Sequence, residues 1–117
     1  MRMTDTEILF MNIVWDREPL SSKELVQRCE ERFGWKKSTT YTFLKRLSEK
    51  GVLENKDSIV SSIVKREEVQ RMESHNVIDV SFNGSLSGFV TAFLSGNKIS
   101  REEYEELIRI INENKEE

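Results

Sequence analysis

Turn-forming and metal-binding residues are scarce in this sequence, which has one proline, five glycines, one cysteine and one histidine among 117 residues. So few prolines and glycines argue against a loop-rich β-sandwich and against a disordered chain. A single cysteine excludes an intramolecular disulfide framework, and one cysteine with one histidine cannot build a structural zinc site from nitrogen and sulfur ligands. We therefore expect no metal and no other cofactor.

Long hydrophobic runs are absent as well. No segment approaches the ~20 apolar residues of a membrane span, and the N-terminus lacks the basic head and apolar core of a signal peptide. The length is that of one ordinary domain or of two very small ones. We expect a soluble, cytoplasmic protein without membrane insertion, and the long stretches free of proline and glycine favour a mainly helical fold.

A strong excess of charge of one sign is also missing, because the net charge is only −3. Taken alone, this value argues against a nucleic-acid partner, but the charges are unevenly distributed. Residues 32–56 contain seven basic and two acidic residues, whereas residues 65–117 contain seven basic and 11 acidic residues. A basic segment followed by an acidic half suggests two functions on one chain.

Local signals place two helices before residue 35. Thr4 and Glu7 form a capping box, which predicts a helix start, and Pro19 predicts the end of that helix. A second capping box follows Pro19 and opens another helix, for which Gly34 is a natural stop. The apolar residues form a broad stripe in the first helix (Ile8, Leu9, Met11, Ile13 and Trp15) and one face in the second (Leu25, Val26, Cys29 and Phe33). We interpret Cys29 as a small buried side chain rather than a reactive thiol.

A third helix is predicted between Ser38, a good N-cap, and Gly51, a good stop. Helical spacing gives it an inner face (Thr40, Phe43, Leu44 and Leu47) and an outer face of hydroxyls and cations (Ser38, Tyr41, Thr42, Lys45 and Arg46), preceded by Lys36 and Lys37. Such an outer face suits a helix that enters the major groove, where hydroxyls meet base edges and cations neutralise phosphates. The alternative is an ordinary solvated helix face.

A short hairpin is predicted after this helix. Between Val52 and Val64, β-branched residues flank the turn-forming segment Asn55-Lys56-Asp57-Ser58. Three helices followed by a two-stranded hairpin form the winged helix-turn-helix arrangement, in which the hairpin tip, here with Lys56, lies along the sugar-phosphate backbone. We therefore expect a winged-helix DNA-binding domain over residues 1–65.

Residues 66–117 are expected to form a helical dimerisation domain. They contain three more predicted helices with strong apolar faces but too little mass for an independent core. A third capping box, Ser100-Arg101-Glu102-Glu103, opens the last of these helices. A second copy would cover these faces and would bring two recognition helices to two DNA half-sites. The alternative is that these helices pack back on the N-terminal half. The expected dimer interface contains Phe89, Val90, Phe93, Leu94, Tyr104, Leu107, Ile108 and Ile111.

Several groups of residues resemble one known family. The first helix carries Thr6-Glu7 and Met11-Asn12-Ile13-Val14-Trp15, and Trp35 precedes a helix of the form Thr39-x-x-Thr42-x-Leu44-x-Arg46-Leu47-x-x-Lys50-Gly51. Further on stand Gly84-Ser85-Leu86-x-x-Phe89-Val90-x-x-Phe93-Leu94 and Glu102-Glu103-Tyr104-Glu105-Glu106-Leu107. Through nearly its whole length, the sequence is similar to the penicillinase-repressor (BlaI/MecI/CopY) family of bacterial winged-helix transcriptional regulators.

The resemblance implies a homodimeric repressor that binds an inverted-repeat operator in double-stranded DNA and is released by an inducing signal. In the penicillinase branch, release follows proteolysis driven by a membrane sensor protease, which makes such a protease a candidate partner. The copper branch binds metal through Cys-x-Cys motifs, which this chain lacks. Carried over to this sequence, the base or near-base contacts are Ser38, Thr39, Tyr41 and Thr42, and the phosphate contacts are Lys36, Lys37, Lys45, Arg46 and Lys56.

Two departures from the family pattern bear on which operator is bound. The segment Ile59-Val60-Ser61-Ser62 is plain where relatives often place aromatic and basic residues, and Tyr41 stands where relatives are often basic. An enzyme is disfavoured, because the sequence shows no glycine-rich phosphate loop and no convergent set of acid, base and nucleophile. The remaining alternative is a winged-helix module that serves protein–protein interaction, which the basic segment around the third helix disfavours.

Overall fold

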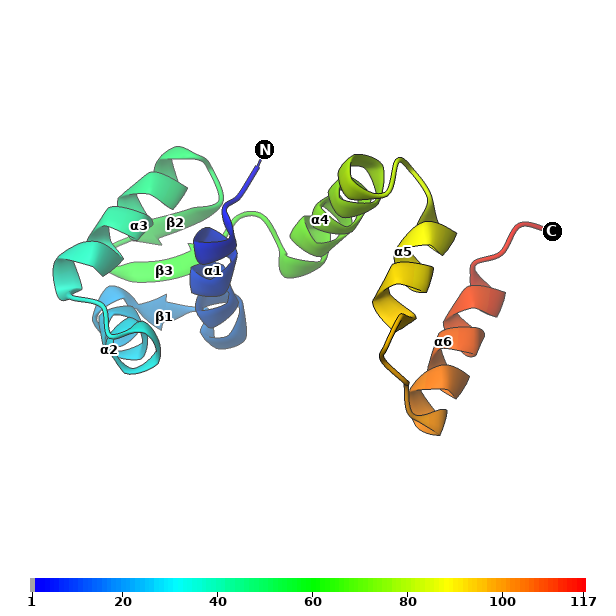
Figure 1. The fold of residues 1–117 in the computed structure, drawn as a ribbon. Coiled ribbons are helices and arrows are strands. Elements are labelled where there is room, and N and C mark those ends of the chain that lie inside the picture. Colours follow the sequence, from blue (N-terminus) through cyan, green and yellow to red (C-terminus); the bar gives the residue numbers. More distant parts are fainter. Residues whose placement is uncertain (1) are drawn as a thin grey trace. The chain divides into compact units, whose positions relative to one another are not determined.

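Residues 2–117 are described by the computed structural model, in which six helices and three short strands follow one another (Figure 1). In chain order these are α1 (Asp5–Arg17), β1 (Leu20–Ser21), α2 (Ser22–Phe33), α3 (Lys37–Glu49), β2 (Leu53–Lys56), β3 (Ile59–Ser62), α4 (Arg66–Ser81), α5 (Leu86–Leu94) and α6 (Arg101–Glu113). The chain divides into two compact units: the N-terminal unit ends at Met72, and the C-terminal unit comprises Glu73–Glu117. This division lies inside α4, whereas the division expected from the sequence, at 65/66, falls immediately before that helix.

The N-terminal unit groups α1, α2 and α3 around a small antiparallel sheet (Figure 1). Its strands lie in the order β1-β3-β2, so the strand that comes last in the sequence is the central one. The sequence patterns do not predict β1, because two residues give no alternation of apolar and polar positions. Leu20 of β1 pairs with Val60 of β3, and this pairing ties the segment between α1 and α2 to the sheet.

The hairpin formed by β2 and β3, which we call the wing, confirms the predicted hairpin but has a shorter turn than expected. Asn55 and Lys56 pair with β3 as strand residues, so only Asp57 and Ser58 form the turn. Their φ values of 53° and 63° lie in the left-handed region, as a two-residue turn between right-twisted strands requires. The turn expected over Asn55–Ser58 is therefore too long by two residues.

Apolar side chains from α1, α2, α3 and the sheet form the core of the N-terminal unit. On one side of this core, the ring of Trp35 lies 4.5 Å from Phe43 and 6.1 Å from Phe10, measured between centroids. Full burial of one large apolar side chain contributes about 1.5–3 kcal/mol. The largest fully buried apolar side chains are Phe10, Met11, Val14, Leu25, Cys29, Leu47, Val52, Leu53 and Val60.

The buried face of α1 differs from the stripe predicted for it. Met11 and Ile13 are buried as expected, but Leu9 is 52% exposed, and Phe10 and Val14 are fully buried instead. The reason is tertiary, because Phe10 packs against the aromatic rings that lie before and within α3. An apolar stripe that covers most of a helix surface does not reveal which part of it finds these partners.

Most predicted helix ends are confirmed. Thr4, Ser21 and Ser100 are N-caps, and the side-chain oxygen of each accepts a hydrogen bond from a backbone N–H three residues later. Gly34 ends α2 with a φ of 70°. These ends follow from side chains within four residues of the helix terminus, which is why the sequence predicts them well.

The prediction that Ser38 caps α3 is wrong. The N-cap is Lys36, the helix begins at Lys37, and no described side chain hydrogen-bonds to this helix end. Trp35 packs between Phe33 and Phe43, with ring centroids 4.8 Å and 4.5 Å away. This packing fixes where the chain enters α3 and outweighs the ~1 kcal/mol preference for serine at an N-cap.

The C-terminal unit contains the second half of α4 together with α5 and α6. Phe89 lies edge-on to Phe82 and also close to Phe93, at centroid distances of 5.4 Å and 6.2 Å. None of the residues of α5 and α6, all of which the structure describes, is buried. Among residues 2–117 no single helix is long and apolar enough to cross a membrane, although α4 and α5, bent by 88° at their junction, reach the required length and composition as a pair.

Candidate nucleic-acid interface

The outer face of α3 is solvent-exposed and carries the residues predicted to contact DNA. Thr40, Leu44 and Leu47 are buried on the opposite side of the helix, and this burial fixes which side chains point outward. The exposed residues are Lys36, Lys37, Ser38, Tyr41, Thr42, Lys45 and Arg46, and Thr39 is half-buried. The predicted division of α3 into an inner and an outer face is therefore confirmed.

Tyr41 stands at the edge of this face, toward α2. Its hydroxyl lies 3.4 Å from Ser22 Oγ, and the Lys37 ammonium lies 5.9 Å from the centre of its ring. Both contacts orient the phenol, since a cation is attracted to an aromatic ring within about 6 Å. A groove of ≈ 470 Å³ follows this edge and is lined by Ser21, Ser22, Lys23, Val26, Gln27, Lys37, Tyr41 and Ser58.

The sequence predictions missed the contribution of α2 to this surface. Lys23 is exposed and, with Gln27, lines the groove beside Tyr41. In helix-turn-helix proteins the helix before the recognition helix crosses the DNA backbone, so a cation and an amide here extend the candidate interface. A signal was available: Lys23 and Gln27 are four residues apart, on the side of α2 opposite to Leu25 and Cys29.

Farther along α3, aromatic and hydroxyl groups orient the predicted DNA contacts. The guanidinium of Arg46 lies 4.8 Å from the ring centre of Phe43, which restricts where this long side chain can place its charge. The Thr42 hydroxyl donates a hydrogen bond of 2.9 Å to the Ser38 carbonyl of the preceding turn. Its lone pairs and its methyl group remain outside, and both can meet base edges in a major groove. Lys45 lines a second groove, of ≈ 300 Å³, together with Asn55 of the wing.

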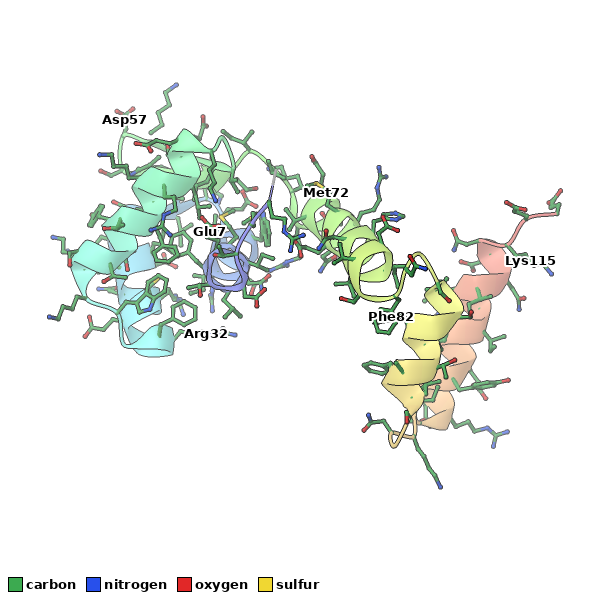
Figure 2. The ribbon with its side chains drawn as sticks, turned by 45° about the horizontal axis from the view of Figure 1, so that its top comes forward. Glu7, Arg32, Asp57, Met72, Phe82 and Lys115 are labelled. Atoms are coloured by element: carbon green, nitrogen blue, oxygen red, sulfur yellow. The ribbon has the colours of Figure 1, made fainter. Side chains whose placement is uncertain are left out.

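The wing tip presents charges of both signs. Lys56 is the last residue of β2 and is exposed, as expected for a phosphate contact. Asp57 follows it at the tip of the turn (Figure 2). A cation beside a carboxylate attracts a phosphate less strongly than an isolated cation does. The wing tip therefore attracts phosphate less strongly than the cations of α3.

One cation of the basic segment is used inside the protein. Lys50 donates to both carboxylate oxygens of Glu7, each at 3.0 Å, and Glu7 is completely buried among the helices of this unit (Figure 2). Burial raises the pKa of Glu7, but hydrogen bonds from the Thr4 backbone N–H and from Lys50 outweigh burial, and the pKa lies below its ordinary value. The ionised pair ties the start of α1 to the end of α3, and its lysine does not add to the charge offered to DNA.

Reactive or metal-binding groups do not gather near α3. Cys29 is completely buried, and burial raises the pKa of its thiol, as suits a small core residue rather than a nucleophile. The Thr40 hydroxyl lies in the same core. Within residues 2–117 no cluster of three or more histidine, cysteine, aspartate or glutamate side chains could hold a metal ion.

The residues predicted to form a dimer interface leave an apolar surface on α5 and α6. Phe89 is half-buried, and the others are exposed: Val90, Phe93, Leu94, Tyr104, Leu107, Ile108 and Ile111. Leu86 and Ile110, which the prediction omitted, are exposed on the same two helices. An apolar groove of ≈ 550 Å³, lined in part by Val77, Ile78 and Phe89, lies between α4 and α5. Several large apolar side chains exposed on two helices are a feature of interaction sites.

Comparison with known proteins adds to this geometry. The family model described as penicillinase repressor matches residues 3–113, which is nearly the whole chain. The chain belongs to the penicillinase repressor family. The resemblance drawn from the sequence motifs is thereby confirmed.

Relatives in this family match the chain almost from end to end. The penicillinase repressor of Bacillus licheniformis is 26% identical over 118 residues, which cover 97% of this chain and 92% of the relative. The methicillin resistance regulatory protein MecI of Staphylococcus aureus strain Mu50 is 27% identical over 114 residues, which cover 94% of this chain and 93% of the relative.

Solved structures from the penicillinase repressor family share the fold. The DNA-binding domain of the repressor BlaI matches 57% of this chain and 87% of that chain, with a TM-score of 0.52 and 21% identity. The monomeric form of Bacillus licheniformis BlaI in complex with the blaP half-operator matches 58% of this chain and 88% of that chain, with a TM-score of 0.51 and 19% identity. The mainly helical, winged-helix fold expected from the sequence is confirmed.

Proposed function

We propose that this protein is a transcriptional repressor that binds an inverted-repeat operator as a homodimer. The observation that carries the proposal is the outer face of α3, where exposed cations flank a row of hydroxyls on a helix fixed by its buried side. Tyr41 and the α2 groove border this face on one side, and Lys45 and the wing border it on the other. We assign base or near-base contacts to Ser38, Thr39, Tyr41 and Thr42, and phosphate contacts to Lys36, Lys37, Lys45, Arg46 and Lys56.

The family and the apolar surface of α5 and α6 support the dimeric part of the proposal. Relatives are named as repressors, and one similar structure is a complex with a half-operator. A half-operator implies two copies on a full operator, since a symmetric dimer addresses two half-sites. Two copies that cover each other's Phe93 and Leu107 would remove from water the surface that α5 and α6 leave exposed.

Release from the operator belongs to the same proposal. We assign it to an inducing signal, with cleavage driven by a membrane sensor protease as the route implied by the penicillinase branch. The family is one of repressors, which points to a role other than catalysis. A winged-helix module for protein–protein contact is the alternative, and the concentration of lysine and arginine along α3 argues against it.

The test is binding to duplex DNA as a function of salt. Duplexes selected by the protein from a random pool should contain an inverted repeat, and the logarithm of the binding constant should fall linearly with the logarithm of salt concentration. Selected sequences without symmetry would contradict the dimeric mode. Binding that is weak and independent of salt would favour the protein–protein alternative.

Two substitutions on α3 distinguish contacts to phosphates from contacts to bases. Lys37→Ala should weaken binding to selected and unrelated duplexes alike and lower the salt slope by about one unit, because one phosphate contact is lost. Thr42→Ala should keep the salt slope and change the preferred bases instead. Arg17→Ala is the matched control for charge, because Arg17 lines a different groove, between α1 and α2.

A further inference from the structure

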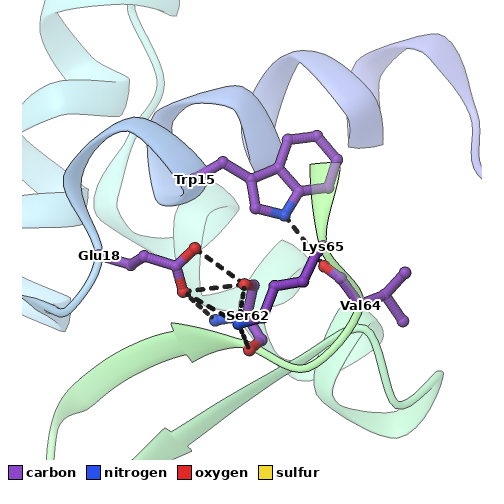
Figure 3. Close-up of polar contacts among 5 residues, drawn as sticks. All are labelled: Trp15, Glu18, Ser62, Val64 and Lys65. Carbon is purple, nitrogen blue, oxygen red and sulfur yellow. Dashed lines mark hydrogen bonds and ion pairs between the residues drawn. The ribbon is translucent and has the colours of Figure 1, made fainter. Parts of the chain in front are cut away.

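The segment that leaves the wing is tied to the end of α1 by a dense polar network (Figure 3). The Trp15 indole N–H donates to the Val64 carbonyl at 3.0 Å. Glu18, which follows α1, accepts from the backbone N–H and the hydroxyl of Ser62, both at 2.8 Å. The Lys65 ammonium donates to the Ser62 carbonyl at 2.9 Å and lies 3.9 Å from the Glu18 carboxylate.

The first turn of α4 is held to α1 as well. The Arg66 guanidinium donates to Asp16 Oδ1 at 2.6 Å and to the Asn12 carbonyl at 3.1 Å, and it lies 5.5 Å from the Trp15 ring centre. One turn later Val69 is buried in the core of the N-terminal unit, at 3% exposure. We call this set of contacts, from Ser62 to Val69 against α1 and Glu18, the clamp.

A connection between two domains is ordinarily exposed, flexible and poor in contacts. Here the division between the units falls after Met72, inside α4, and this helix continues from Arg66 to Ser81 without a break. The clamp therefore holds one end of a continuous helix whose other end belongs to the C-terminal unit.

We infer that the clamp sets the spacing between half-sites that the dimer accepts. This inference rests on the proposed function, because it needs two N-terminal units joined through their C-terminal units. With its first turn clamped, α4 acts as a stiff connector, and a stiff connector favours only sites at a matching separation and rotation. With the clamp loosened, the N-terminal units would behave as loosely tethered modules that accept several spacings.

Arg66 and Asp16 make the sharpest test, because their removal changes the net charge in opposite directions. Arg66→Ala removes a cation and should weaken DNA binding slightly by charge alone, whereas Asp16→Ala removes an anion and should strengthen it. Both break the same contact in the clamp. An effect that the two variants share is therefore mechanical rather than electrostatic.

The experiment uses the full-length chain and three duplexes: the selected inverted repeat, the same repeat with five base pairs inserted between the half-sites, and a single half-site. Five base pairs turn one half-site to the opposite side of the helix, since a turn has about 10–10.5 base pairs. We expect the insertion to weaken binding of the unaltered protein at least tenfold. In Arg66→Ala and in Asp16→Ala, this penalty, the loss of affinity caused by the insertion, should be at least threefold smaller than in the unaltered protein. The affinity of each variant for the single half-site should differ by less than twofold from the value expected from its change of charge alone.

Controls keep the outcomes distinct. Arg17→Ala removes a cation next to Asp16 but outside the clamp and should keep the full penalty. Trp15→Phe combined with Arg66→Ala removes a second contact while retaining an aromatic ring, and it should reduce the penalty further in a protein that still unfolds cooperatively. If both single variants and the combined variant keep the full penalty, the clamp does not set the spacing and the proposed function stands. If the unaltered protein shows no preference for two half-sites, both the inference and the dimeric function fail.

Discussion

The two units of this protein bury apolar side chains to very different extents. In the N-terminal unit, Phe10, Leu25 and Leu47 are fully buried in one core that joins three helices and a sheet. In the C-terminal unit, α5 and α6 also carry large apolar side chains, such as Phe93 and Leu107, yet none of their described residues is buried. The first unit buries its apolar side chains within one chain, whereas the second leaves apolar side chains on α5 and α6 exposed.

The difference follows from how many elements meet at each core. Phe10 lies in a core built from three helices and the sheet, and it contacts the rings of Trp35 and Phe43. In contrast, α5 is nine residues long, and its phenylalanines reach only neighbours such as Phe82 on the same unit. Segments of this size rarely bury enough surface to be stable alone. Stability of the C-terminal unit should therefore depend on protein concentration, and that of the N-terminal unit should not.

The largest effect is expected from opening the core of the N-terminal unit. Phe10→Ala should lower its free energy of unfolding by about 3–5 kcal/mol, since the large cavity cannot be refilled by neighbouring rings. Both tryptophans, Trp15 and Trp35, lie in this unit, so their fluorescence in a urea titration reports its unfolding. Phe93→Ala is the matched control and should leave the tryptophan transition in place. Equal losses in the two variants would contradict the comparison between the units.

A charge in the exposed apolar surface should disrupt the proposed dimer. Phe93→Asp should raise the dimer dissociation constant at least 100-fold, about 2.7 kcal/mol, because a carboxylate would be taken from water without a partner. Sedimentation equilibrium measures the change. Thr91→Asp places the same charge on the opposite side of α5 and should leave the dimer intact. A Phe93→Asp protein that sediments as a dimer would refute the interface.

Acid should weaken the N-terminal unit through Glu7. Since the folded-state pKa is lowered, ionised Glu7 stabilises the fold above the pKa of an unfolded glutamate, about 4.3, and this contribution is lost as the pH falls through the lower folded-state value. Glu7→Gln should lower the free energy of unfolding by about 1–3 kcal/mol at pH 7. This is less than for a fully buried ion pair, because solvent reaches Lys50. At pH 3 the unaltered protein and the variant should differ less. Urea titrations at both pH values test this, and a constant difference would argue against an ionised pair.

The smallest effect is expected at the outer face of α3. Arg46→Ala should reduce affinity for any duplex by about 1 kcal/mol at moderate salt and lower the salt slope by about 0.9, the value for one neutralised phosphate. Tryptophan fluorescence should show nearly unchanged stability, since Arg46 is exposed. Fluorescence anisotropy of labelled duplexes measures both quantities. If the salt slope stays the same, Arg46 does not contact the backbone and the docking of α3 needs revision.

Local features of the fold were predictable because their causes lie within a few residues. Thr4 and Ser100 cap helices through donors three residues away, and Gly34 ends α2 by its own conformation. The outer face of α3 followed from the spacing of its buried residues. The candidate contacts on α3 are therefore exposed, except for the half-buried Thr39. Ser38 was wrong as a cap, because Trp35 packing, a tertiary effect, decides where α3 begins.

Contacts between distant residues were not predictable in the same way. Lys50 pairs with Glu7 across 43 residues of sequence, and Arg66 reaches Asp16 across 50. The Tyr41 hydroxyl meets Ser22, 19 residues earlier, and brings Lys23 of α2 to the candidate interface. Each of these side chains has many oppositely charged or polar partners in the sequence, and only the packing of the helices selects one.

By itself, the sequence determined the helices, the wing, the exposed face of α3 and the unpaired apolar faces near the C-terminus, because each depends on short-range spacing. Tertiary structure decided which lysine is withdrawn from the basic segment, how α2 joins the groove beside Tyr41, and how the start of α4 is clamped to α1. These depend on distances between elements, which are set when the core around Phe10 closes and not by any single segment.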